Sequence, residues 1–102
     1  MYQFQVFVPA THKEELKSAI FAAGGGKLGA YDSCCFETRG TGQFRPLNSA
    51  NPFVGQVNKI EFVDEVKIEM VVLKKHLKDV IEAMKKTHPY EEPAYQYWIV
   101  NQ

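Results

Sequence analysis

The residues of this chain that could carry out chemistry gather in one stretch near its carboxyl end, HPYEEPAYQYW, residues 88 to 98. His88, Glu91 and Glu92 offer one imidazole and two carboxylates, which could hold a divalent metal ion or transfer protons. The alternative is structural: the two prolines would shape a corner between a helix and a strand, with the tyrosine rings packed and the glutamates in water. We favour the corner because it explains the prolines without a ligand, and we keep four candidate ligand-binding residues: His88, Tyr90, Glu91 and Glu92.

A second candidate site is the glycine-rich stretch RGTGQFR, residues 39 to 45. Gly40-Thr41-Gly42 suggests a short turn, after which Gln43 to Arg45 would fold back as a hairpin arm. The turn would bring two guanidinium groups near backbone N–H groups, an arrangement that can cradle an anion. The alternative is a hairpin whose arginines face water or pair with Asp64 and Glu65. The candidate ligand-binding residues here are Arg39, Gly40, Thr41, Gly42 and Arg45.

The bulk composition limits the classes of partner. The chain has 102 residues, of which 45% are hydrophobic and 24% charged, so we expect one globular domain over residues 1 to 102. Twelve basic residues balance twelve acidic ones, which leaves no net field to attract nucleic acid. The adjacent Cys34 and Cys35 would form a strained disulfide and match no zinc spacing, so we expect reduced thiols. With neither a signal-peptide pattern nor a membrane span, we expect a cytoplasmic location and no membrane partner.

Hydrophobic periodicity predicts the elements that must position these residues. Alternation predicts strands over residues 2–8, 31–39, 66–72 and 95–100, while residues 57–63 are left open as an extra strand or an irregular arm. Stripes at helical spacing predict one helix from about Thr11, with Thr11 and Glu14 as a capping box and Gly24 to Gly26 as its stop, and a second over residues 74–86.

The order strand, helix, strand, strand, helix, strand predicts an α+β, ferredoxin-like βαββαβ fold: an antiparallel sheet with both helices on one face and an extra hairpin arm between the second and third strands. Right-handed crossovers would place the first and third strands in the centre. Phe7, Val71, Trp98 and Val100 would then leave the other sheet face largely apolar. We therefore expect a homo-oligomer that packs through this open face or its edges.

The motifs GTGQFRP, NPFVG and HPYEEPAY, in this order, resemble the YqfO-type insert of the NGG-interacting-factor-three-like family. The resemblance spans Tyr2 to Val100 and implies a PII-like, CutA-like fold that tends to form trimers, with a dimer as the alternative. Larger family members are named as GTP cyclohydrolase I type 2 homologues and hold a two-metal centre in a separate domain. No residues of this chain match that domain.

The sequence leaves three functions open. We favour a non-catalytic oligomeric module that binds a small effector, a metal ion or a protein partner at clefts between subunits. The second function is a metal-dependent hydrolase whose divalent metal is held by His88, Glu91 and Glu92. The third is a structural lid or partner of a larger family metalloprotein. No cofactor is certain, and a divalent metal stays open.

Overall fold

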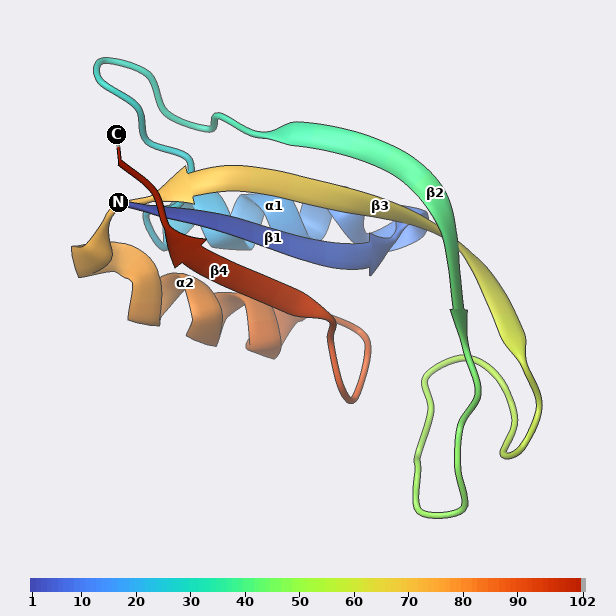
Figure 1. Cartoon of the computed structure of the whole chain (residues 1–102). Helices are drawn as coiled ribbons and strands as arrows, with labels where there is room; N and C mark the ends of the chain where they lie inside the picture. Colours follow the sequence, from blue (N-terminus) through green and yellow to red (C-terminus); the bar gives the residue numbers. More distant parts are fainter. Residues whose placement is uncertain (102) are drawn as a thin grey trace.

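The computed structural model describes residues 1–101 and consists of a four-stranded antiparallel sheet covered by two helices (Figure 1). The elements are β1 (Tyr2–Pro9), a 3-10 turn η1 (Ala10–His12), α1 (Lys13–Ala22), β2 (Phe36–Phe44), β3 (Glu61–Val72), α2 (Lys74–Thr87) and β4 (Tyr95–Ile99). The strand order is β2-β3-β1-β4, which confirms the prediction that the first and third strands lie in the centre.

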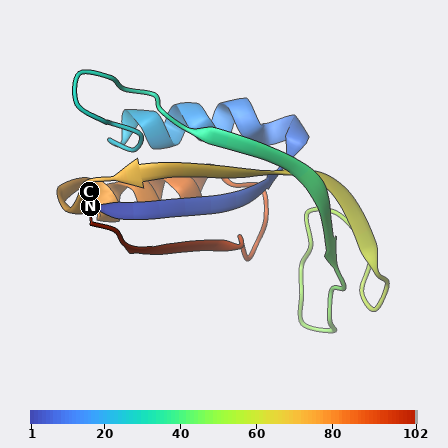
Figure 2. The same cartoon turned by 45° about the horizontal axis from the view of Figure 1, so that its top comes forward.

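The core lies between the sheet and the helices, and Figure 2 shows both helices on the same side of the sheet. Alternate residues of the central strands face the helices and form one half of the core. The helices α1 and α2 each add two fully buried side chains to it. Each such buried aliphatic or aromatic side chain contributes about 1.5–3 kcal/mol to stability. The fully buried set is Phe4, Val6, Val8, Leu16, Ile20, Val66, Ile68, Val72, Val80 and Met84.

The start of α1 differs from the predicted capping box. The helix begins at Lys13 with His12 as its N-cap, and no side chain caps it. Because the 3-10 turn Ala10–His12 precedes the helix and makes His12 the cap, Glu14 stands two residues after the cap and not the three that a capping box needs. The Thr11 hydroxyl instead lies 2.8 Å from Nδ1 of His12. The predicted stop is confirmed, since Gly24 follows the helix at a φ of +110°, where glycine is favoured.

The second strand lies farther along the chain than predicted. Residues 31–35 are outside it, and β2 runs through Gly40, Thr41 and Gly42, which pair with Glu65, Asp64 and Val63 of β3. The predicted turn and the fold-back of Gln43 to Arg45 are therefore wrong. The reason is that β3 offers antiparallel partners along all nine residues of β2. Glycine weakens a strand but can still adopt its extended backbone.

An arm projects from the sheet, and it is made by β2 and β3 themselves. The pairing of β3 with β1 ends at Glu65, whereas its pairing with β2 continues to Glu61. Figure 1 shows this two-stranded ribbon bending away from the body and ending in the loop that joins the strands, residues 45–60. Of the segment left open as 57–63, residues 61–63 begin β3, and residues 57–60 belong to the loop.

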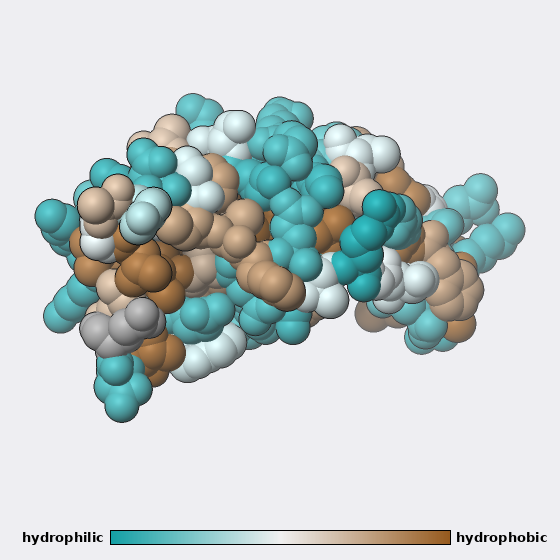
Figure 3. All heavy atoms as spheres, turned by 90° about the horizontal axis from the view of Figure 1, so that it is seen from above, coloured by the Kyte–Doolittle hydropathy of each residue, from teal (hydrophilic) through white to brown (hydrophobic). Residues whose placement is uncertain are grey.

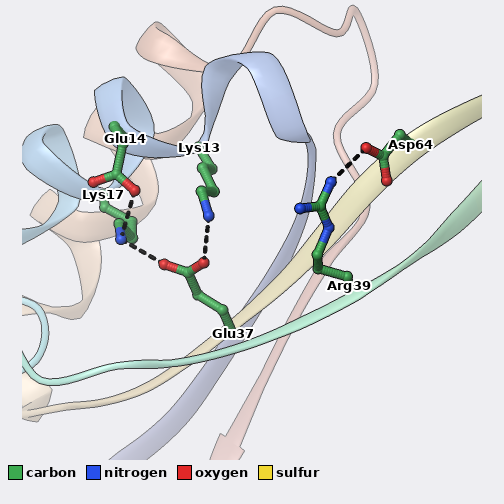
Figure 4. A network of polar contacts seen from close by, with 6 residues as sticks. All are labelled: Lys13, Glu14, Lys17, Glu37, Arg39 and Asp64. Atoms are coloured by element: carbon green, nitrogen blue, oxygen red, sulfur yellow. Dashed lines mark hydrogen bonds and ion pairs between the residues drawn. The ribbon is translucent and has the colours of Figure 1, made fainter.

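A group of ion pairs fastens β2 to α1 (Figure 4). The Glu37 carboxylate accepts from Lys13 Nζ at 2.9 Å and also from Lys17 Nζ, which in turn pairs with Glu14 at 2.9 Å. The hydrogen bond from Lys17 lowers the pKa of Glu37, and the bond to Glu37 raises the pKa of Lys17. This cluster therefore favours the charged forms and holds the edge strand against the helix.

The open face of the sheet is more polar than expected. Phe7, Val71 and Trp98 lie on it, but polar side chains separate them: a Gln5–Gln96 hydrogen bond of 2.7 Å and a Lys67–Glu69 contact of 4.0 Å. The exposed large apolar side chains lie instead on the arm, near the start of β2 and on β4. Figure 3 looks onto a different side, from above the view of Figure 1, and there too hydrophilic residues cross the middle of the molecule. The expectation of a largely apolar face is thus corrected to a face with a polar centre.

The cysteines lie just before β2, at residues 34 and 35, and both thiols are free. Cys35 packs against the core, and burial raises the pKa of its thiol. Cys34 instead donates to the backbone oxygen of Asp32 at 3.5 Å. Among residues 1–101, no helix has the length and hydropathy needed to cross a membrane.

Candidate functional site

A cleft of about 510 Å³ opens where the arm meets the body. One wall is the end of β2 with the following loop, and the other is the corner between α2 and β4. The two segments lie more than thirty-five positions apart in the sequence, and in Figure 1 they hang on the same side of the sheet. The lining residues are mainly apolar or aromatic, with four charged side chains among them: Arg45, Glu65, Glu91 and Glu92.

The carboxylate of Glu65 forms the base of this cleft. Glu65 is 9% exposed, and its Oε2 accepts from the Tyr90 hydroxyl at 2.8 Å. A Cβ at Gly42 would lie 2.3 Å from the Glu65 carboxylate, so glycine leaves the space in which that carboxylate lies. Burial and the bond to Glu65 raise the pKa of Tyr90, which keeps its phenol protonated as a donor.

His88 stabilises the corner between α2 and β4 through two hydrogen bonds. Its Nδ1 accepts from the Tyr90 backbone N–H at 3.0 Å, so its Nε2 carries the proton and donates to the Phe7 carbonyl oxygen at 2.7 Å. The side chain is buried, and this desolvation lowers the pKa of the imidazole. His88 is therefore a neutral residue whose two ring nitrogens are both engaged, and its ring lies 5.2 Å from that of Tyr90.

Within residues 1–101, one hydrogen bond and one aromatic contact connect the loop of the arm to the body beside the cleft. The Asn51 N–H donates to Oε1 of Glu91 at 3.1 Å. The Phe53 ring meets the His12 ring edge-on, with 5.4 Å between their centroids. Because the contacts are so few and are partly exposed to solvent, we infer that little free energy holds the loop over the cleft.

The structure divides the residues predicted from the two motifs. Arg45, Tyr90, Glu91 and Glu92 all line the cleft. Gly42 supports Glu65, and His88 supports Tyr90 from outside the lining. Gly40 and Thr41 lie on the arm away from the cleft, with open space around the position of a Gly40 Cβ.

The two arginines do not form the predicted anion cradle. They are six positions apart along an extended segment, which separates them by roughly 20 Å at about 3.3 Å per residue. Arg39 pairs with Asp64 at 2.7 Å on an exposed face, as the alternative interpretation had it (Figure 4). Arg45 is exposed at the cleft.

That His88, Glu91 and Glu92 bind a metal ion stays a prediction, and the hydrogen bonds of His88 oppose it. A metal ion would need a free imidazole nitrogen, and each nitrogen of His88 is in a hydrogen bond. Within residues 1–101, no three His, Cys, Asp or Glu side chains come close enough together to hold a metal ion. A metal at this corner would require His88 to break one of its bonds.

Among the cleft residues that sequence reasoning missed are Phe44, Phe53 and Glu65. The Phe44 ring meets Tyr90 with 5.7 Å between centroids, and Phe53 closes the cleft from the loop. Glu65 occupies the same parity in β3 as Lys67 and Glu69, and so has the pattern of a solvent-facing charge. In the folded chain Glu65 contacts Tyr90 and Gly42, and no pattern within β3 signals these contacts.

Comparisons with known proteins relate this chain to one segment of larger proteins. No family model matches it. It is 45% identical over 98 residues to a protein of Halalkalibacterium halodurans named "GTP cyclohydrolase 1 type 2 homolog", covering 96% of this chain and 26% of that protein. A Bacillus subtilis protein of the same name is 45% identical over 97 residues. The chain thus spans about a quarter of the length of the curated relatives it matches.

Solved structures agree with this relationship. A Bacillus cereus protein related to NIF3 superposes with a TM-score of 0.84 at 38% identity, covering 99% of this chain and 26% of that one. CutA1 from Pyrococcus horikoshii superposes with a TM-score of 0.70 at 16% identity, covering 100% of this chain and 85% of that one. The latter similarity establishes the CutA-like fold alone. By sequence and fold together, this chain matches one segment of YqfO-type, NGG-interacting-factor-three-like proteins, and the fold of that segment is PII/CutA-like.

Proposed function

We propose that this chain acts as a non-catalytic, homo-oligomeric binding module whose binding site is the cleft at the base of the arm. The observation that carries the proposal is the cleft itself, about 510 Å³ in volume and walled by the arm loop and the α2–β4 corner. A concave site with mainly apolar walls and a few polar groups is the usual form of a small-molecule site. The lightly fastened loop gives such a ligand a way in and out.

The exposed apolar side chains support self-association. The arm carries five of them, a second group lies near the start of β2, and a third lies on β4. Clusters of this kind on one small domain favour burial against another protein surface. They are Leu47, Phe53, Val57, Ile60 and Phe62 on the arm, Leu28, Tyr31 and Phe36 near β2, and Tyr97, Trp98 and Ile99 on β4.

The assembly that we favour is a trimer, with a dimer as the alternative, and contacts through the arm and the sheet edges. The polar centre of the open face makes that region a weaker candidate for the interface. Free thiols at Cys34 and Cys35 fit the cytoplasmic location that we propose. A larger metalloprotein of the family is a further proposed partner.

The rival role as a metal-dependent hydrolase gains no support from the cleft. It would require a metal at His88, Glu91 and Glu92, and both His88 nitrogens are engaged. The name "GTP cyclohydrolase 1 type 2 homolog" belongs to proteins about four times as long as the matched segment, so we assign no GTP chemistry to this chain.

Size-exclusion chromatography with light scattering tests the assembly. At micromolar concentration we expect a mass well above the 11.6 kDa of one chain, as a trimer or a dimer would have. Phe62→Ser, on the exposed arm, should weaken the assembly, while Lys78→Ser, on the exposed side of α2, should leave it unchanged. A wild-type protein that stays monomeric at this concentration would contradict the proposal of a homo-oligomer.

A further inference from the structure

Acidic side chains outnumber basic ones in the cleft. Three carboxylates, from Glu65, Glu91 and Glu92, line it together with one guanidinium, from Arg45. Arg45 is exposed, whereas Glu65 is 9% exposed. Because charges act more strongly where water is excluded, the Glu65 carboxylate dominates the electrostatics at the base of the cleft.

One oxygen of that carboxylate remains available. Oε2 accepts from Tyr90, but Oε1 receives no hydrogen bond from any residue between 1 and 101. No fully buried side-chain oxygen in these residues lacks a partner, so Oε1 keeps access to solvent, and Glu65 lines the cleft. The carboxylate lies against Gly42, where a Cβ would come within 2.3 Å of this oxygen. A donor group entering the cleft would therefore find an acceptor held in place by Tyr90.

The walls around this carboxylate suit the body of an organic cation. The Phe44 and Tyr90 rings lie 5.7 Å apart at an interplanar angle of 62°, and Phe7 and Phe53 also line the cleft. Aromatic faces attract ammonium and guanidinium groups, and they bury attached carbon chains. An anionic ligand would instead face three carboxylates, with only Arg45 to oppose them.

We propose that this cleft binds a small organic cation, whose ammonium or guanidinium group donates to Oε1 of Glu65 while its carbon skeleton lies against the Phe44 and Tyr90 rings. The inference rests on the proposed binding function and adds the class of ligand. A charge-assisted hydrogen bond at a water-poor position supplies the specificity, and the rings supply apolar contact.

Three indole compounds that differ at their end group test the class of ligand by calorimetric titration. Tryptamine is a cation, tryptophol is neutral and indole-3-propionate is an anion. We expect tryptamine to bind at least tenfold more tightly than tryptophol, and indole-3-propionate to bind more weakly than either. Raising the salt concentration should weaken the binding of tryptamine more than that of tryptophol.

Glu65→Gln tests the position, because the amide keeps an acceptor for Tyr90 and removes the charge. We expect this variant to bind tryptamine about as weakly as tryptophol, while Glu15→Gln, at an exposed position of α1, leaves the affinity unchanged. Amide chemical shifts of the wild-type protein give a second readout that does not depend on a variant. They should move in residues 43–54 and 90–94 on addition of tryptamine, and shifts confined to other regions would overturn the inference.

The outcomes separate this inference from the proposed function. Equal affinity of the wild-type protein for tryptamine and tryptophol, or an unchanged affinity of Glu65→Gln for tryptamine, overturns the proposal that the ligand is a cation. Tighter binding of indole-3-propionate that shifts residues 43–54 overturns the cation but supports the cleft as a binding site. If none of the three compounds binds and the protein is monomeric, both the inference and the proposed function fail.

Discussion

The Tyr90 hydroxyl donates to the buried Glu65 carboxylate over 2.8 Å, and this bond joins the α2–β4 corner to the base of the arm. The two residues are 25 positions apart in the sequence. Gly42 leaves room for the carboxylate, and His88 accepts from the Tyr90 backbone, so four residues determine how the corner meets the arm. The geometry of the cleft depends on this connection.

Tyr90→Phe should destabilise the protein. The substitution keeps the ring and removes the only side-chain donor, among residues 1–101, to a carboxylate that is 9% exposed. Leaving a charged, buried acceptor without its partner costs about 1–3 kcal/mol of unfolding free energy. Urea denaturation measures this loss, and Tyr97→Phe, at an exposed ring with no hydroxyl bond within residues 1–101, is the control. Equal stability of the two variants would contradict the role of the bond.

Gly42→Ala should disturb the same carboxylate from the other side. The new Cβ would lie 2.3 Å from the Glu65 carboxylate, which must move away from Tyr90. We expect a loss of about 1–3 kcal/mol, the cost of a broken bond at a buried carboxylate. Gly40→Ala is a matched control in the same strand, because its Cβ meets nothing within 4 Å. Denaturation curves in which both variants match the wild type would show that the close approach is unimportant.

His88 should make the stability of the protein depend on pH. Desolvation lowers the pKa of the folded imidazole below its ordinary value of 6.5. Between these two pKa values the unfolded chain binds a proton that the folded chain does not, so stability falls as the pH falls. The contribution is fully present above about 6.5 and is lost as the pH drops toward the folded pKa.

Denaturation in urea between pH 7.5 and pH 5 measures this effect, and His88→Gln should flatten the curve in that window. The carboxylate of Glu37, whose pKa is lowered from 4.5, contributes only at more acidic pH and does not confuse the comparison. A variant that keeps the full wild-type slope would assign the pH dependence to other groups.

Glu37→Gln should loosen the contact between β2 and α1. The change removes the partner of both Lys13 and Lys17, whose side chains are 29% and 15% exposed. Since solvent screens such pairs, we expect a loss of about 1 kcal/mol that shrinks at high salt. Asp64→Asn breaks the exposed Arg39 pair and should cost less, because those side chains are 69% and 63% exposed. The reverse order of the two losses in thermal unfolding would contradict this assignment.

The sequence by itself determined the central strands, both helices and the strand order. Phe4, Val6 and Val8 in β1, and Ile68, Met70 and Val72 in β3, alternate because each strand buries one face against the helices. Burial of this kind leaves a local period that can be read without coordinates. The helix-ending glycines and Pro89 likewise act through local backbone geometry.

Only the tertiary structure decided the course of β2, the arm and the cleft. Of the nine residues of β2 none is fully buried, so this edge strand carries no clear period, and its glycines resemble a turn. Glu65 has the pattern of a surface charge until Tyr90 covers it. The cleft is built from contacts between segments that are distant in the sequence. The free energy of such contacts depends on which surfaces meet in the folded chain, and a local residue pattern does not encode it.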